Sequence, residues 1–272
     1  MNTNPFGQFL IRSYLVIFLF FLLAPLAIMG GAALNDAPFP SVYPWTGFTD
    51  RWFIALWNDD RMWIAVRNTV LVAISVVVLA VPVGTAAAIL VNSVAPRVRG
   101  FLYGVMVAPI LTPGVVIGIS TLLFWNSFSV PAGLWLSALG QVSYIAAYVM
   151  LLVLARLQSF DHLLEEAALD LGASHFQVVR RILLPHLYPA LGAGVFISFF
   201  QSVENFNVTL FTRGYSETLT IYIFSQVRAG ISPVINALAF GLIILTIVGA
   251  VLYEFSRQRV AKRRTAKAGA AS

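Results

Sequence analysis

The sequence predicts an all-α integral membrane protein with six transmembrane helices. Of its 272 residues, 59% are hydrophobic and 10% are charged, whereas soluble domains average about 45–50% apolar and about 25% charged residues. Long stretches contain no charged residue, and a helix needs about 20 predominantly apolar residues to cross the hydrocarbon core of a bilayer. The charge-free stretches are 13–35, 68–96, 100–155 and 229–253, and Glu204 alone interrupts a fifth at 182–212.

Each stretch supplies one helix except 100–155, which is long enough for two. Asn126, Pro131 and Gly133 lie midway along it and suit a short turn at the membrane surface. We therefore expect helices at about 11–31, 66–91, 101–124, 133–155, 187–208 and 236–256. We expect kinks in the third helix at Pro109, Pro113, Gly114 and Gly118, and in the second at Pro82 and Gly84.

Orientation follows from the positive residues, because Lys and Arg are enriched in cytoplasmic loops. Placing the N-terminus inside puts twelve of the seventeen Lys and Arg residues on the inner side. These are Arg12, Arg97, Arg99, Arg156, Arg180, Arg181 and the six between Arg257 and Lys267. Both termini are therefore predicted to be cytoplasmic.

One membrane domain accounts for residues 1–258, with an outer loop at 32–65 and a cytoplasmic segment at 156–185. Residues 259–272 form a basic cytoplasmic tail that we expect to be disordered. Its charges dominate the net charge of +6 and would attract anionic lipid headgroups, so membrane lipid rather than nucleic acid is the expected partner. The first stretch exceeds the 7–15-residue core of a signal peptide, so we expect a retained helix.

The cytoplasmic segment 156–185 is predicted to form two short helices joined by a turn. Ser159 suits a helix start, acidic residues follow it, and strong helix formers continue to Leu171. Gly172 allows a sharp change of direction, a second helix can run from Ser174 to about Ile182, and Pro185 ends it. Two amphipathic helices of this kind suit docking into a groove on another protein.

The spacing of residues in this segment carries a family resemblance. Glu166-Ala167-Ala168, three residues, Gly172, nine residues and Ile182-Leu183-Leu184-Pro185 resemble the EAA loop of ABC importer permeases of type I. The resemblance implies that the loop forms coupling helices that sit in a cleft of a cytoplasmic ATPase subunit. It implies that the contact with the ATPase is made by Glu166, Ala167, Ala168, Asp170 and Gly172.

Other phrases are similar to the second permease of spermidine/putrescine-type importers. They include 45–49 in the outer loop, 169–174 in the cytoplasmic segment and 232–239 at the last helix. We call the cytoplasmic segment 156–185 the coupling segment. The implied partners are two ATPase subunits, a second homologous permease and a periplasmic or extracellular solute-binding protein. ATP and Mg would be bound by the ATPase subunits, because this chain lacks the G-x-x-x-x-G-K-[ST] phosphate loop, so neither a catalytic role nor a cofactor is expected here. His162, His175 and His186 lack metal-ligand spacing, and no metal is expected.

Glu204 is the candidate solute-binding residue of the membrane domain. A carboxylate within a span is costly, by roughly 2.5–3.5 kcal/mol, and usually faces a pathway or cavity. Gln201, Asn205 and Asn207 surround it with polar groups that could hold an amine such as a polyamine.

Alternatives remain open for both the residue and the protein. Glu204 could instead pair with Arg213 or Arg228, and the solute could be 4-aminobutyrate or an aminophosphonate. A self-sufficient secondary transporter or channel is the alternative of a different class. The sequence leaves open whether the permease pair is formed by identical or different chains.

Overall fold

The computed structural model describes residues 5–161, 163–230 and 232–269. Within these residues the regular elements are all helical, apart from one isolated bridge between Asn35 and Phe48. The chain divides into two compact units, Met1–Asp60 with Ile223–Ser272, and Arg61–Tyr222. The predicted all-α class is therefore observed.

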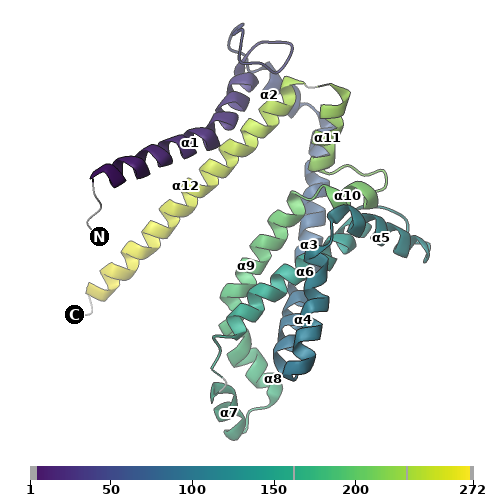
Figure 1. Cartoon of the computed structure of the whole chain (residues 1–272), viewed down its shortest axis with the longest axis vertical. Helices are drawn as coiled ribbons and strands as arrows, with labels where there is room; N and C mark the ends of the chain where they lie inside the picture. The colour runs from purple at the N-terminus through teal and green to yellow at the C-terminus, as the bar shows by residue number, and fades with distance from the viewer. Residues whose placement is uncertain (1–4, 162, 231, 270–272) are drawn as a thin grey trace. The chain divides into compact units, whose positions relative to one another are not determined.

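The first unit consists of α1 (Pro5–Leu34), α2 (Arg51–Trp57) and α12 (Pro233–Gly269). α12 contacts both α1 and α2 (Figure 1), and the ring of Phe240 lies 6.3 Å from that of Phe53. Only 11% of the most apolar part of α1 is buried. A helix that is apolar on every side suits a lipid environment.

Asn35 organises the loop that joins α1 to α2. Its side-chain nitrogen donates to the carbonyl oxygens of Ser41 and Pro44, at 2.9 and 3.1 Å. Its side-chain oxygen accepts from the backbone nitrogen of Thr46 at 2.9 Å, and its backbone oxygen accepts from the indole of Trp52. A buried amide that is satisfied at both ends gives the loop one defined conformation.

The second unit carries the remaining elements. They are α3 (Asp60–Ser93), α4 (Pro96–Leu111), α5 (Gly114–Asn126), α6 (Leu134–Leu157), α7 (Leu163–Asp170), α8 (His175–Val178), the π-helix η1 (Val179–Leu183), α9 (Leu184–Val203), α10 (Asn207–Thr212) and the start of α11 (Leu219–Ala229). α6 is central, because it contacts α4, α5, α9 and α10 (Figure 1). Its Val149, Met150 and Val153 join Val91 of α3 and Leu187 of α9 in a buried apolar cluster.

Four helical segments among the described residues are long and apolar enough to cross a membrane: α1, α3, α6 and the continuous segment His175–Val203. The pair α4 and α5 makes a fifth if it is counted as one span, although its halves are bent by 102°. In α12 the apolar helix is shorter, at Pro233–Gly249. The count of six spans therefore stays a prediction.

Three predicted boundaries differ from the structure. The helix predicted at 101–124 is interrupted between Leu111 and Gly114, and the one predicted at 187–208 stops at Val203. α12 continues through Gly269, so the disorder expected over 259–272 is not observed as far as that residue, and 270–272 lie outside the described residues. Ala, Arg and Lys supply eight of the eleven residues 259–269, and all three are strong helix formers.

Candidate functional site

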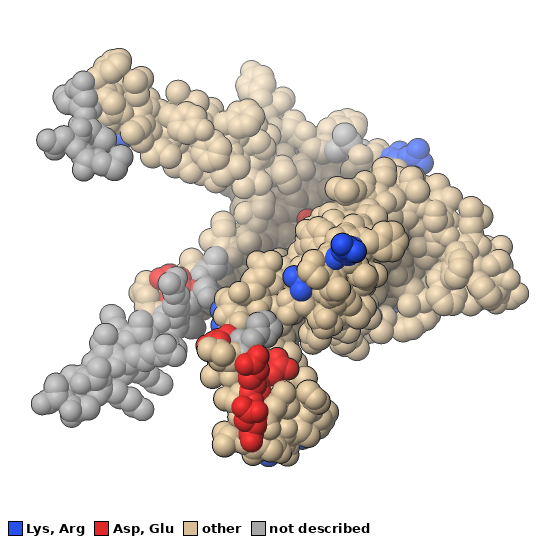
Figure 2. Space-filling model, turned by 60° about the horizontal axis from the view of Figure 1, so that its bottom comes forward, with Lys and Arg blue, Asp and Glu red and all other residues tan. Residues whose placement is uncertain are grey.

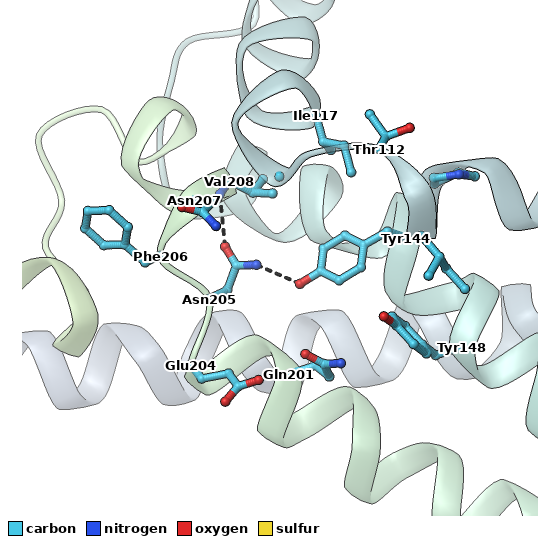
Figure 3. A pocket seen from close by; sticks show the side chains of 13 residues that line it. Thr112, Ile117, Tyr144, Tyr148, Gln201, Glu204, Asn205, Phe206, Asn207 and Val208 are labelled. Carbon is cyan, nitrogen blue, oxygen red and sulfur yellow. Dashed lines mark hydrogen bonds between the residues drawn. The ribbon is translucent and has the colours of Figure 1, made fainter.

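Two interrupted helices meet at one cavity in the second unit. α4 and α5 are separated at Thr112 and Pro113, and α9 and α10 at Glu204–Phe206. A cavity of about 300 Å³ lies between these breaks and the face of α6 that carries Tyr144 and Tyr148 (Figure 3). Helix breaks that line a cavity are a recurrent way to build solute sites in transporters, because exposed backbone groups can then face the solute.

The first break has a local cause. Pro113 has no backbone N–H, and its ring disfavours helical geometry in the preceding residue. Thr112 accordingly adopts extended angles, with φ −84° and ψ 129°. The predicted kink is thus a 102° bend, and α5 then lies against α10.

Glycines allow this close approach of α5 to α10. A Cβ atom added at Gly118 would lie 3.1 Å from the Cα atom of Val208, and one added at Gly114 would lie 2.9 Å from the Cβ atom of Asn207. The two helices can therefore approach at backbone distance, which holds the breaks on opposite sides of the cavity.

Asn205 lies two residues before α10 and links the start of that helix to α6. Its side-chain oxygen accepts from the backbone nitrogens of Val208 and Thr209, both at 3.2 Å, as an amide near a helix N-terminus commonly does. Its side-chain nitrogen donates to the hydroxyl of Tyr144 at 2.6 Å (Figure 3). Both ends of the amide therefore form hydrogen bonds within the protein.

A buried glutamine extends this polar network. Gln141 of α6 is fully buried, donates to the hydroxyl of Thr209 at 2.9 Å and accepts from Ser202 at 2.6 Å. An unpaired amide would be costly at this depth, so the network specifies how α6, α9 and α10 fit together.

The four predicted pathway residues, Gln201, Glu204, Asn205 and Asn207, all line this cavity. Glu204 is exposed and is absent from the ion pairs recorded among the described residues. Arg213, one of its two suggested partners, instead donates to the backbone oxygen of Ser216 at 2.8 Å. The Glu204 carboxylate is thus available on the cavity side.

Sequence reasoning did not single out Tyr144 and Tyr148. They stand one turn apart on α6, with ring centres 6.3 Å apart and ring planes at 81°, and both line the cavity beside Glu204 (Figure 3). Their four-residue spacing in an apolar helix was the available signal. Aromatic faces next to a carboxylate form a suitable environment for an organic cation.

The segment 156–185 forms a second candidate site. α7 starts at Leu163, where Asp161 accepts from the backbone nitrogen, rather than at Ser159. Gly172 has a φ of 87°, and Ser174 caps α8 through a reciprocal pair of hydrogen bonds with Gln177. The glycine turn and a helix on each side of it are present, while His162 lies outside the described residues. The prediction that Pro185 ends the second helix is wrong, because the helical segment continues from His175 to Val203, with the π-helix η1 just before the proline.

The surface of this segment is both apolar and acidic. Leu163, Leu171 and Phe176 are 68%, 89% and 72% exposed, and the acidic side chains of α7 form a strip beside them (Figure 2). Glu166, Ala167, Asp170 and Gly172 are exposed, and Ala168 is partly exposed. The five residues that the resemblance assigns to the ATPase contact therefore lie at or near the surface.

The sequence of residues 80–266 matches the family described as binding-protein-dependent transport system inner membrane component. The chain is 31% identical over 243 residues to the spermidine/putrescine transport system permease protein PotC of Escherichia coli (strain K12), which covers 89% of this chain and 91% of that protein. It is 34% identical over 229 residues to the putrescine transport system permease protein PotI of the same organism, covering 80% of each.

Solved structures share the fold. A bacterial ABC transporter involved in the import of the acidic polysaccharide alginate superimposes with a TM-score of 0.68 at 16% identity, covering 94% of this chain and 98% of that one. The MetNI methionine ABC transporter gives a TM-score of 0.55 at 18% identity, with 78% and 97% covered. The chain belongs to the family of binding-protein-dependent transport system inner membrane components and is a permease subunit of an ABC importer.

Proposed function

We propose that this permease imports a small polyamine such as putrescine or spermidine through the cavity between the two helix breaks. The observation that carries the proposal is the Glu204 carboxylate, which faces that cavity without an ion pair among the described residues. The names of PotC and PotI, both polyamine transport permeases, support the same class of solute.

The groups around the cavity favour a positive charge. α4 ends at Leu111 and α9 at Val203, and the carbonyl end of a helix carries a partial negative charge. The faces of Tyr144 and Tyr148 add an attraction for ammonium groups, worth about 0.5–2 kcal/mol. A single carboxylate is modest for a solute with two or more charges, so the partner permease is expected to supply further acidic groups.

The coupling segment is proposed to bind the ATPase subunit. Its exposed leucines and Phe176 have no covering element within the described residues of the chain, and burying them in a cleft would be favourable at about 25 cal/mol per Å². The acidic strip of α7 would meet basic groups of that subunit. ATP and Mg are proposed to be held by two such subunits and not by this chain.

We also propose the complete topology of the importer subunit. Six spans would arise if α4 with α5 forms one crossing and α12 another, which places both termini and the segment 156–185 in the cytoplasm of a bacterial inner membrane. A second, homologous permease would complete the pathway, and a solute-binding protein would deliver the solute from outside. The basic end of α12 would lie at the anionic inner surface of the membrane.

Solute-stimulated ATP hydrolysis tests the proposal. The complete complex would be reconstituted in lipid with its binding protein and supplied with putrescine, spermidine, 4-aminobutyrate or an aminophosphonate. Stimulation by the two polyamines alone is the expected result. Stimulation by 4-aminobutyrate or the aminophosphonate alone would replace the polyamine by that solute and leave the permease assignment intact.

A further inference from the structure

A reciprocal contact closes the base of the coupling segment. The side-chain Nε atom of Arg156, near the end of α6, donates to the backbone oxygen of His186 at 3.1 Å. The Nε2 atom of the His186 ring lies 3.2 Å from the backbone oxygen of Arg156. Because a carbonyl oxygen only accepts, this ring nitrogen must carry the hydrogen. We call this pair of hydrogen bonds the Arg156–His186 clamp.

The clamp is packed as well as hydrogen bonded. The ring of Phe160 meets that of His186 edge to face, with centres 5.2 Å apart, and both Phe160 and Leu157 are buried. The last turn of α6 and the first turn of α9 are thus fastened together, although thirty residues separate Arg156 from His186 in the sequence.

The chain beside the clamp is held less firmly. Between α8 and α9 the helix widens to the π form, and the backbone nitrogen of Leu184 donates to the oxygen of Val179, five residues earlier. Pro185 explains the change, because it cannot donate to Arg181 four residues before it. Pro189 likewise cannot donate to Pro185. Short π-helical turns often occur at functional positions.

The Arg156–His186 clamp is therefore a fixed contact, and the π turn beside it is a weakened part of the helix about which the coupling segment could move. We propose that Arg156 and His186 are positioning residues for coupled transport, whose clamp makes α6 and α9 respond together when the coupling segment moves about the π turn. The inference rests on the proposed docking of this segment to the ATPase. Since α9 and α6 both carry residues of the solute cavity, the clamp connects the two candidate sites.

Variants of the clamp test this role in the reconstituted complex, with uptake of putrescine and hydrolysis of ATP measured together. His186→Leu and Arg156→Met remove the side-chain donors and are expected to lower the putrescine transported per ATP roughly tenfold, within the usual range of coupling between sites. His186→Gln keeps a donor near the position of Nε2 and should restore the ratio. Tyr188→Leu, an exposed position on the same helix, is the matched control.

The outcomes separate this inference from the proposed docking. ATPase subunits that remain bound to the His186→Leu complex but hydrolyse ATP with little uptake would support the clamp. A normal transport ratio in that variant, or a His186→Gln variant as defective as His186→Leu, would overturn it while leaving docking intact. Loss of the ATPase from the clamp variants alone would also overturn it, by making the clamp an assembly contact. Failure of the wild-type chain to hold the ATPase would refute the docking itself.

A separate variant tests the π turn before Pro185. Pro185→Ala restores a donor for the carbonyl of Arg181 and permits an ordinary α-helical turn. Putrescine uptake per ATP should then fall although the clamp residues are intact. Unchanged uptake per ATP would remove the π turn from the mechanism.

Discussion

The side-chain nitrogen of Asn205 donates a 2.6 Å hydrogen bond to the hydroxyl of Tyr144. This contact joins the break between α9 and α10 to the aromatic wall of the cavity. The side-chain oxygen of the same asparagine accepts from the backbone nitrogens of Val208 and Thr209 in the first turn of α10. Its principal role in this structure is therefore to shape the cavity, whereas Glu204 beside it forms no ion pair among the described residues.

Replacing Asn205 by Ala should destabilise the protein by about 1–3 kcal/mol. The change leaves partners of both ends of the amide unpaired in a partly buried place, and an unsatisfied buried polar group costs about that much. Thermal unfolding in detergent measures the effect. Asn207→Ala, at an exposed position on the same cavity, is the control, and equal stability of the two variants would contradict the role assigned to Asn205.

Removing the charge of Glu204 should weaken binding of a cationic solute. Glu204→Gln keeps the shape of the side chain and removes a charge-assisted contact worth about 1.5–3 kcal/mol. The putrescine concentration that gives half-maximal uptake is therefore expected to rise roughly tenfold or more. Gln201→Glu, which adds a carboxylate to the same cavity, should have the opposite effect. Uptake assays on both variants decide the matter, and identical uptake would return Glu204 to a structural role.

The main spans could be predicted from the sequence because a lipid-embedded helix needs apolar side chains over its whole length. α1 and α3 extend a few residues beyond the predicted 11–31 and 66–91 at both ends, and α6 lies within two residues of the predicted 133–155. The end of α9 could not be predicted in this way, since the apolar stretch continues beyond it. The local signal was Asn205, a residue that starts helices well.

The cavity was only partly predictable, because it depends on contacts between distant parts of the chain. Pro113 predicted a kink, but the size of the bend depends on how closely Gly118 lets α5 approach α10. Tyr144 and Tyr148 precede Glu204 by more than fifty residues, and nothing local shows that they share a cavity with it. In contrast, the coupling segment is a local structure, and its glycine turn could be predicted from residue types alone.

Gly172→Val should disrupt the coupling of ATP hydrolysis to solute uptake without preventing insertion of the protein into the membrane. The φ of 87° at Gly172 is unfavourable for a β-branched residue, at about 1–3 kcal/mol, so α7 and α8 would change their relative direction. Solute uptake and stimulated ATP hydrolysis are expected to fall together at an unchanged membrane level. Gly192→Val, where nothing lies within 4 Å of an added Cβ atom, adds the same side chain at a glycine without a positive φ and is the control. Normal uptake by Gly172→Val would refute the expectation.

Gly84 should not tolerate even a methyl group. A Cβ atom there would lie 2.7 Å from the Cβ atom of Val149 and 3.0 Å from the backbone nitrogen of Met150. Gly84→Ala would push α3 away from α6, and this is expected to lower the free energy of unfolding by about 1–3 kcal/mol. Gly104→Ala, with open space around the added atom, should be neutral or stabilising by about 0.5–1 kcal/mol. Equal melting temperatures of Gly84→Ala and Gly104→Ala would disprove the close contact.

Among the contacts that hold residues 217–219 to α3, a buried hydrogen bond should matter more than an exposed ion pair. Arg61 and Glu217 form an ion pair at 2.9 Å, but the arginine is 61% exposed, and exposed pairs contribute about 0.2–1 kcal/mol. The buried hydroxyl of Thr69 accepts from the backbone nitrogen of Leu219 at 2.7 Å. Thr69→Val leaves that N–H unpaired, at a cost of about 1–3 kcal/mol.

Thermal unfolding of Thr69→Val and Arg61→Gln at low salt and at about 0.5 M salt separates the two contributions. Salt screens charges at the surface far more than it affects a buried neutral hydrogen bond. The loss in Arg61→Gln should therefore shrink as salt is added, while the larger loss in Thr69→Val should persist. The reverse ranking would mean that the ion pair, and not the buried hydroxyl, holds the start of α11 on α3.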